Sequence, residues 1–249
     1  MITEPGIVSD EWNAYSAERD GLLMFVSFDE SATRETPPAE LRCCARVQIP
    51  IHAPNGAGGP DSAEAKRLYE MEDELVAILE EDGVRCRLVG RLTYDGLREL
   101  VFQLEDWESF RPPVGFWLIG HDEYDIDVSE HDGWDFFDKH VRPRIEDRIW
   151  MMDRSVVGAL IETGSDPQKE HSLDYVFAGD EKGLRQVARV LKPRGYEPVG
   201  KFDPASGQIL LAKRMPLDLP AIVEESIANY HAAHESNVAC DGWGAAVVR

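Results

Sequence analysis

The sequence predicts an α+β protein built from two layered domains, at residues 1–150 and 151–249. Its 249 residues exceed one ordinary domain of about 150 residues and leave room for two. Apolar residues recur at a period of two in some segments and at three- and four-residue steps in others, which indicates strands mixed with amphipathic helices. In the second half the order is helix, then β-α-β-β-α-β, which is typical of a ferredoxin-like (split βαβ) domain with an extra N-terminal helix.

In the first domain, local signals predict a long helix and a hairpin. Asp61, followed three residues later by Glu64, is a capping-box-like start, and Gly83 predicts the end of the same helix. The dipeptide Asp95-Gly96 lies between two apolar runs, at 84–94 and 97–104, and therefore predicts a β-hairpin. The other expected elements are strands at 22–28 and 41–51, a short helix around Trp107, a strand at 114–128 and a helix at 132–148.

The second domain has more regular patterns. Gly164 is well placed to end the extra helix, and a Pro-Ala-Ser-Gly turn at 204–207 joins two strands. The expected elements are helices at 153–163, 181–192 and 217–235, and strands at 172–177, 195–202, 208–215 and 243–248.

The formal net charge of −21 is unevenly distributed along the chain. Residues 1–150 contain 33 acidic and 15 basic side chains, whereas residues 151–249 contain 14 and 11. Residues 105–138 alone contain eleven acidic side chains and one basic side chain, Arg111. Because such a chain repels phosphate backbones, direct binding of nucleic acid is disfavoured.

The acidic segment 105–138 has two interpretations. A solvated face that keeps the protein soluble is one, and a docking surface for a basic protein partner is the other. On the second interpretation the expected contact residues are Glu123, Asp125, Asp127, Asp132 and Asp135.

No common catalytic motif occurs in the sequence, and the best arrangement of potential metal ligands lies in the acidic segment. His121, Glu123, Asp125 and Asp127 alternate, so they would share one face of the expected strand at 114–128. Ligands two residues apart can converge on a hard cation, although a second element usually contributes. We favour a solvated acidic strand face here, and we expect no metal, no cofactor and no catalytic residue.

The sequence gives two indications of the cellular compartment. The four cysteines show no Cys-x-x-Cys spacing, which favours free thiols in a reducing environment. The first twenty residues lack the basic and apolar regions of a signal peptide, and no apolar run approaches 18 residues. We therefore expect a cytoplasmic protein without a membrane segment.

The C-terminal half carries several residues in the order found in a known family. They are Gly164-Ser165-Asp166 after a helix, His171 to Phe177 as the next strand, Gly195-Tyr196-Glu197, and Asp241-Gly242-Trp243 near the end of the chain. On these residues the half resembles the bacterial ribonuclease E inhibitor family, also called regulator of ribonuclease E activity B. The resemblance implies a protein that lowers the activity of a ribonuclease by contact.

The N-terminal half resembles a separate bacterial family defined only as a domain of unknown function. Glu11-Trp12 with Tyr15, the helix from Glu64 to Glu81, and Gly90-Arg91-Leu92-Thr93 with Gly96, Arg98 and Glu99 carry this likeness. It implies a cytosolic bacterial protein and no known reaction.

Two functions follow as hypotheses. The first is a non-enzymatic regulator that binds a basic protein, with a ribonuclease as the partner implied by the resemblance. The second is a small-ligand-binding protein or enzyme with a site between the two domains. Within the family motifs we expect Gly164, Ser165, Asp166, Asp241, Gly242 and Trp243 to be structural, and Trp243→Ala to cost roughly 3–5 kcal/mol of stability. The sequence leaves the oligomeric state open.

Overall fold

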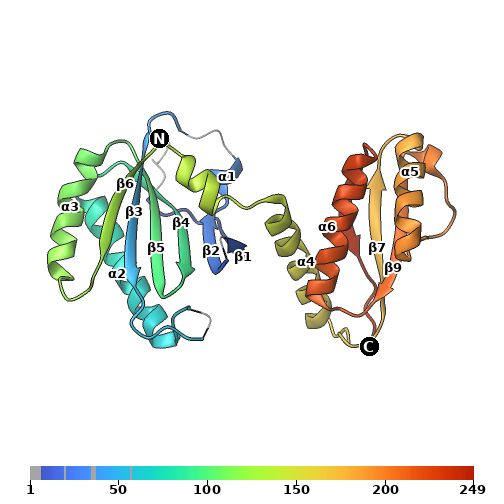
Figure 1. Cartoon of the computed structure of the whole chain (residues 1–249), viewed down its shortest axis with the longest axis horizontal. Coiled ribbons are helices and arrows are strands. Elements are labelled where there is room, and N and C mark those ends of the chain that lie inside the picture. The colour runs from blue at the N-terminus through green and yellow to red at the C-terminus, as the bar shows by residue number, and fades with distance from the viewer. Residues whose placement is uncertain (1–6, 20, 35–37, 57) are drawn as a thin grey trace. The chain divides into compact units, whose positions relative to one another are not determined.

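The computed structural model describes residues 7–19, 21–34, 38–56 and 58–249, and the chain forms two compact units, Met1–Pro143 and Arg144–Arg249. Each unit has its own sheet and its own helices (Figure 1), so the predicted α+β class is confirmed. The expected boundary near residue 150 falls inside a helix of the second unit.

The first unit contains a six-stranded antiparallel sheet with the strand order β1-β2-β4-β5-β3-β6. Its strands are β1 (Trp12–Arg19), β2 (Leu22–Asp29), β3 (Cys43–Pro50), β4 (Cys86–Tyr94), β5 (Leu97–Leu104) and β6 (Asp127–Asp132). The sequence does not predict β1, because its residues alternate polar with apolar only weakly.

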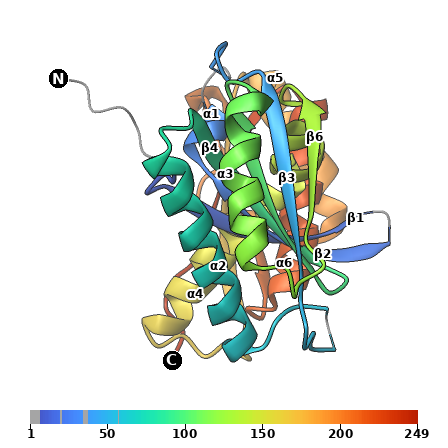
Figure 2. The same ribbon diagram turned by 90° about the vertical axis from the view of Figure 1, so that its left-hand side faces the viewer.

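Two helices, α2 (Ser62–Glu81) and α3 (Trp107–Gly120), cover one face of this sheet (Figure 2). A short helix, α1 (Ser31–Arg34), follows β2. The core between helices and sheet is apolar and includes Leu75, Leu79, Leu100, Phe102 and Trp117, each at most 1% exposed. Burial of this apolar surface is the main force that holds the unit together.

The local signals for α2 and for the hairpin are confirmed. The Asp61 side chain accepts a hydrogen bond from the backbone nitrogen of Glu64 at 2.9 Å, as an N-cap does. Asp95 and Gly96 have φ angles of 45° and 76° between the paired strands β4 and β5. Positive φ at both central residues is what a tight two-residue hairpin turn requires.

The expected strand at 114–128 is wrong, because residues 114–120 lie in the helix α3 and the strand begins only at Asp127. The buried residues Phe110, Val114 and Trp117 recur at four- and three-residue steps and face the sheet. Pro112 and Pro113 lie inside the helix, although proline disfavours the interior of a helix. A short apolar run does not by its periodicity separate a buried strand from a buried helix.

The expected helix at 132–148 is also wrong. The segment instead contains the end of β6, a five-residue π-helix η1 (Phe137–Val141), and the start of the long helix α4 (Ile145–Glu162). Arg142 has ψ of 124°, an extended conformation, because the ring of Pro143 disfavours a helical residue before it. The helix expected at 153–163 therefore begins eight residues earlier, at Ile145.

The second unit contains a four-stranded antiparallel sheet with the order β10-β7-β9-β8. Its elements after α4 are β7 (His171–Ala178), α5 (Glu181–Leu191), the 3₁₀ turn η2 (Lys192–Arg194), β8 (Glu197–Pro198), the 3₁₀ turn η3 (Pro204–Ser206), β9 (Gln208–Met215), α6 (Leu219–Glu235) and β10 (Ala239–Gly244). The order β-α-β-β-α-β is the predicted one.

Alternate residues of the central strands β7 and β9 face the helices of this unit. Leu173, Tyr175 and Phe177 of β7 are at most 1% exposed and pack with Leu184 of α5 and Ile222 of α6. This alternation is the reason that the period-two pattern predicted both strands well.

Two strands of the second unit differ from expectation. β8 covers only two residues of the expected 195–202 segment, and β10 ends at Gly244 instead of running from 243 to 248. The pairing of β10 with β7 shifts register between Cys240 and Trp243, where Gly242 has φ of 80°. This bulge interrupts the alternation from which the strand was predicted.

Candidate functional site

The five carboxylates expected to contact a partner all lie on the surface of the first unit. Glu123 and Asp125 are in the turn between α3 and β6, and Asp127 is the first residue of β6. Asp132 is the last residue of β6, and Asp135 follows it. All five are exposed. We call these five residues the acidic edge.

The acidic edge is not one compact cluster. Five residue steps along β6 separate Asp127 from Asp132, which at 3.3–3.4 Å per residue is about 17 Å. β6 is the outer strand of the sheet and, among the described residues, pairs only with β3. The carboxylates therefore mark both ends of an open sheet edge. Such a placement keeps like-charged edges apart and also suits an extended segment of opposite charge.

The strand face on which the metal interpretation depended is absent. Residues 121–126 form a turn, so His121, Glu123 and Asp125 do not share one face of a strand with Asp127. The Nε2 atom of His121 instead lies 3.0 Å from Oε2 of Glu74 on α2. Within the described ranges no three His, Cys, Asp or Glu side chains are grouped as metal ligands.

Next to the acidic edge, α3 exposes two large apolar side chains. Phe116 is 70% exposed and Ile119 is 74% exposed. Their positions differ by three along the helix, so both lie on the same outward face. Exposed apolar side chains grouped near charged residues are typical of protein-binding surfaces.

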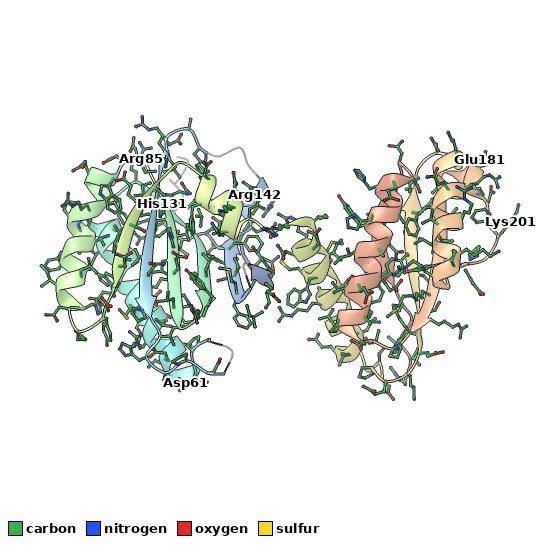
Figure 3. All side chains as sticks on the ribbon, in the orientation of Figure 1. Asp61, Arg85, His131, Arg142, Glu181 and Lys201 are labelled. Atoms are coloured by element: carbon green, nitrogen blue, oxygen red, sulfur yellow. The ribbon has the colours of Figure 1, made fainter. Side chains whose placement is uncertain are left out.

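A buried carboxylate on the face of the sheet opposite to α2 and α3 was missed by sequence reasoning. Glu99 is 1% exposed, and its carboxylate accepts hydrogen bonds from Arg46, from Gln48 at 3.1 Å and from Tyr94 at 3.3 Å. The Arg46 guanidinium also lies 3.1 Å from Nε2 of His131 on β6. Figure 3 labels His131 on the first unit. Both oxygens of the Glu99 carboxylate accept hydrogen bonds in this network, which joins strands β3, β4, β5 and β6.

The sequence did contain a signal for this network. Arg98 and Glu99 interrupt an otherwise apolar strand, and charged residues inside a buried strand must be paired. The basic partner of Glu99, however, is Arg46 of β3, which lies 53 residues away in the sequence.

The residues of the N-terminal likeness also support one another. The Arg91 guanidinium binds the Glu72 carboxylate through Nε at 2.7 Å and stacks over the Trp12 ring at 3.7 Å. The Tyr15 hydroxyl donates to the backbone carbonyl of Val141 at 2.9 Å. These contacts tie β1 and β4 to α2 and to η1.

In the second unit, the Gly164-Ser165-Asp166 motif holds the C-terminal segment. Gly164 has φ of 96°, a conformation that disfavours residues with a Cβ. Ser165 accepts a hydrogen bond from the backbone nitrogen of Val248 at 3.3 Å, and Asp166 donates its own backbone N–H to the Val248 carbonyl at 2.8 Å.

The Asp241-Gly242-Trp243 motif is anchored on α4. The indole Nε1 of Trp243 donates to Oδ1 of Asp153 at 2.7 Å. Asp153 is 4% exposed, and burial raises its pKa to about 6, while hydrogen bonds from Trp243 and Ser226 oppose this rise. Asp241 is exposed. Gly242 and Trp243 are thus held by backbone geometry and by a side-chain hydrogen bond.

A chain of buried polar groups continues from this point through the second unit. The Tyr175 hydroxyl lies 3.1 Å from Oγ of Ser226. Farther along α6, Asn229 donates to the Tyr196 hydroxyl at 2.7 Å, and this hydroxyl donates to Glu225 at 3.1 Å. Burial raises the pKa of both Tyr175 and Tyr196. The hydroxyls therefore stay protonated and serve as hydrogen-bond partners.

The two units define an α+β protein. In its second unit the motif residues Ser165, Asp166 and Trp243 make hydrogen bonds within the unit. None of the described helices combines the length and the apolar character needed to span a bilayer. Comparison with family models then places the whole chain: it belongs to a family of unknown function, DUF695, through residues 10–140 and to the regulator of ribonuclease activity B family through residues 150–245. Both expected resemblances are confirmed.

Two individual proteins give more detail. A regulator of ribonuclease activity B from Pseudoalteromonas atlantica (strain T6c / ATCC BAA-1087) is 32% identical over 100 residues, which cover 37% of this chain and 85% of that protein. A crystal structure of a protein assigned as a glycine cleavage system transcriptional repressor aligns over 83% of this chain and 98% of its own, with 12% identity and a TM-score of 0.23.

Proposed function

We propose that this protein regulates a bacterial ribonuclease by binding it. Family membership carries the proposal: a relative named as a regulator of ribonuclease activity B is matched over 85% of its length by this chain, and residues 150–245 match the model of that family. In that unit the family residues Ser165 and Trp243 are used in internal hydrogen bonds. Contact, rather than a chemical step, is therefore the proposed means of regulation, and the cytoplasm is the proposed compartment.

The proposed contact surface is the acidic edge together with the apolar pair on α3. Ribonucleases bind a polyanion, so their RNA-binding regions carry basic side chains that exposed carboxylates complement. Phe116 and Ile119 add apolar surface that is removed from water when a partner covers it. This combination supports a basic protein with an apolar contact as the partner.

A direct binding measurement tests this surface. Purified ribonuclease E is immobilised, and association of the full chain is followed at about 50 mM salt, where screening is weak. The triple variant Glu123→Gln, Asp125→Asn, Asp127→Asn is expected to weaken binding at least about tenfold, because three charges are removed from one end of the edge.

A matched triple variant separates this surface from total charge. Asp10, Glu11 and Glu18 are exposed residues in or just before β1, the outer strand at the opposite edge of the same sheet. Changing them to Asn, Gln and Gln removes the same charge and is expected to alter binding less than about twofold. Equal weakening by both triple variants, or no binding by the parent chain, would show the proposed surface to be wrong.

A further inference from the structure

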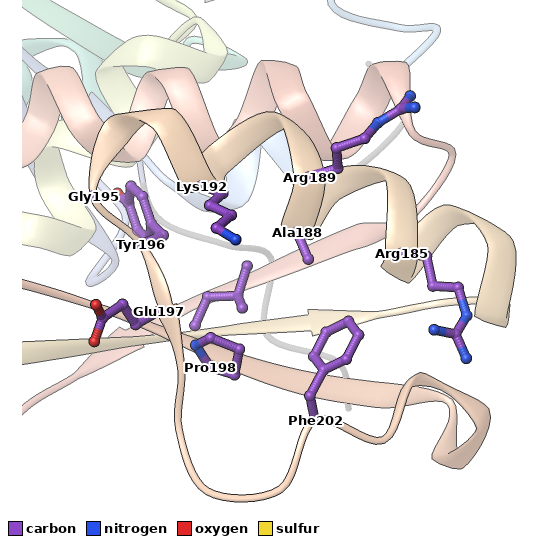
Figure 4. Close-up of a pocket in the computed structure, with 10 residues that line it drawn as sticks. Arg185, Ala188, Arg189, Lys192, Gly195, Tyr196, Glu197, Pro198 and Phe202 are labelled. Atoms are coloured by element: carbon purple, nitrogen blue, oxygen red, sulfur yellow. The ribbon is translucent and has the colours of Figure 1, made fainter.

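A groove in the second unit lies between α5 and the loop that follows β8 (Figure 4). Its volume is about 690 Å³. The residues that line it include Arg185, Ala188, Lys192, Pro198, Phe202 and Leu211. This groove is separate from the acidic edge, which belongs to the first unit.

The lining of the groove carries three basic side chains, Arg185, Arg189 and Lys192, and one acidic side chain, Glu197, although the chain as a whole is strongly acidic. Residues 182–214 contain eight basic side chains and two acidic ones, Glu197 and Asp203. Arg185 and Lys192 lie seven residues apart on α5 and η2, which places them two helical turns apart on one side. In Figure 4 both extend toward the loop side of the helix, whereas Arg189 points away from it.

The positive charge at the groove is only partly neutralised. Arg185 pairs with Glu181, but both side chains are more than half exposed, so solvent screens this pair. Arg194, just beyond Lys192, pairs with Glu225. Among the described residues no carboxylate lies within ion-pair distance of Lys192. A negatively charged ligand would supply an ion-pair partner for Lys192.

The floor of the groove is apolar. Ala188 and the Phe202 ring face each other across it (Figure 4), and Leu211, which is 1% exposed, also lines the groove. Phe202 itself is 37% exposed, so one side of its ring is in water. A ligand that fits this floor carries an aliphatic or aromatic group between its negative charges.

We propose that this groove binds an acidic peptide segment with a central apolar side chain. Its carboxylates would pair with Arg185 and Lys192, and its apolar side chain would lie on Phe202 and Ala188. A nucleic acid also combines negative charge with apolar rings, but its charge continues at every nucleotide beyond the groove. The chain carries a net charge of −21, which repels such a polymer more than a few clustered carboxylates. This proposal does not depend on ribonuclease regulation.

Fluorescence anisotropy with a labelled decapeptide tests the proposal. The peptide consists of Asp and Glu residues with one central Phe, and it is titrated with the full chain at about 50 mM salt. Saturable binding is expected. Lys192→Glu is expected to weaken it about tenfold, equivalent to about 1.4 kcal/mol. Phe202→Ala, and a peptide with Ser in place of Phe, are each expected to weaken it at least about threefold.

Lys182→Glu is the matched control. Lys182 lies on α5 but does not line the groove. Its replacement by Glu changes the net charge by the same amount as Lys192→Glu does. It is expected to alter the affinity less than about twofold. Absence of saturable binding, or equal weakening by Lys182→Glu and Lys192→Glu, would overturn the proposal. Tighter binding of a single-stranded RNA of the same length, with the same loss on Lys192→Glu, would overturn the peptide as occupant.

Discussion

The indole nitrogen of Trp243 lies 2.7 Å from Oδ1 of Asp153 and donates a hydrogen bond to it, although 90 residues separate the two along the chain. Trp243 lies at the end of the bulge in β10, and Asp153 is a buried residue of α4. The pair thus fastens the extra helix of the second unit to the edge strand of its sheet.

Two substitutions of Trp243 are expected to destabilise the second unit to different degrees. Trp243→Phe keeps an aromatic ring but removes the indole donor to the buried Asp153 carboxylate, at a cost of about 1–3 kcal/mol. Trp243→Ala also removes the packing against Tyr175 and should cost about 3 kcal/mol, at the lower end of the expected range, because Trp243 is only half-buried. Urea unfolding, with hydrogen exchange of the β7 amides to assign the transition, measures both. Equal stability of Trp243→Phe and the parent would contradict this role.

The buried Asp153 carboxylate makes stability depend on pH. Its pKa is raised from 3.8 to about 6 in the folded chain, so the folded state binds more protons than the unfolded state between these values. Stability should therefore fall as pH rises from about 4 to about 6 and then level off, by up to about 3 kcal/mol from this residue. Asp153→Asn keeps an acceptor for Trp243 and removes the titration. The difference in unfolding free energy between variant and parent should change over this pH range, and a constant difference would refute the assignment.

Gly242 is expected to be intolerant of a side chain for a backbone reason. Its φ of 80° is costly for any residue with a Cβ, so Gly242→Ala should lose about 1–2 kcal/mol of stability. Gly244 is the natural control, since its φ is not positive and an added Cβ meets no atom within 4 Å. Gly244→Ala should be close to neutral in the same thermal unfolding experiment. Equal effects at the two positions would mean that conformation is not the cause.

In the first unit, Gly90 leaves room for Val141. A Cβ at Gly90 would lie 2.5 Å from a methyl group of Val141, so Gly90→Ala should overpack this contact and cost about 1–3 kcal/mol. The double variant Gly90→Ala, Val141→Ala should recover part of that loss, because the smaller side chain makes space. Thermal unfolding of the parent, both single variants and the double variant measures the coupling. If the losses of stability in the two single variants simply add up in the double variant, the contact between Gly90 and Val141 would be contradicted.

The parts of this structure that the sequence predicts are those set by local rules. The N-cap at Asp61 and the turn at Asp95-Gly96 act within a few residues, so both were found. The helix α3 was mistaken for a strand because its prolines and apolar run are ambiguous without the sheet that it covers. The Pro143 ring divides two helical segments that read as one periodic run.

For the candidate sites too, the sequence predicts features that depend on residue type but not those that depend on the folded arrangement. Exposure of the acidic edge follows from charge alone and was expected for all five carboxylates. Their separation to the two ends of β6 depends on where that strand begins, which the sequence misplaced. The groove beside Lys192 and Phe202 brings together segments that only the folded second unit places side by side. Pairs such as Trp243 with Asp153 leave no periodic signal.

The central claim is that this protein lowers ribonuclease activity by a charge-dependent contact, and one measurement tests it most directly. Cleavage of an RNA substrate by purified ribonuclease E is followed with increasing concentrations of the full chain at about 50 mM and about 300 mM salt, where the Debye length falls from about 14 Å to about 6 Å. We predict saturable inhibition at low salt and at least a tenfold higher half-maximal concentration at high salt. Cleavage that is unchanged at every concentration of the chain at low salt would contradict the account.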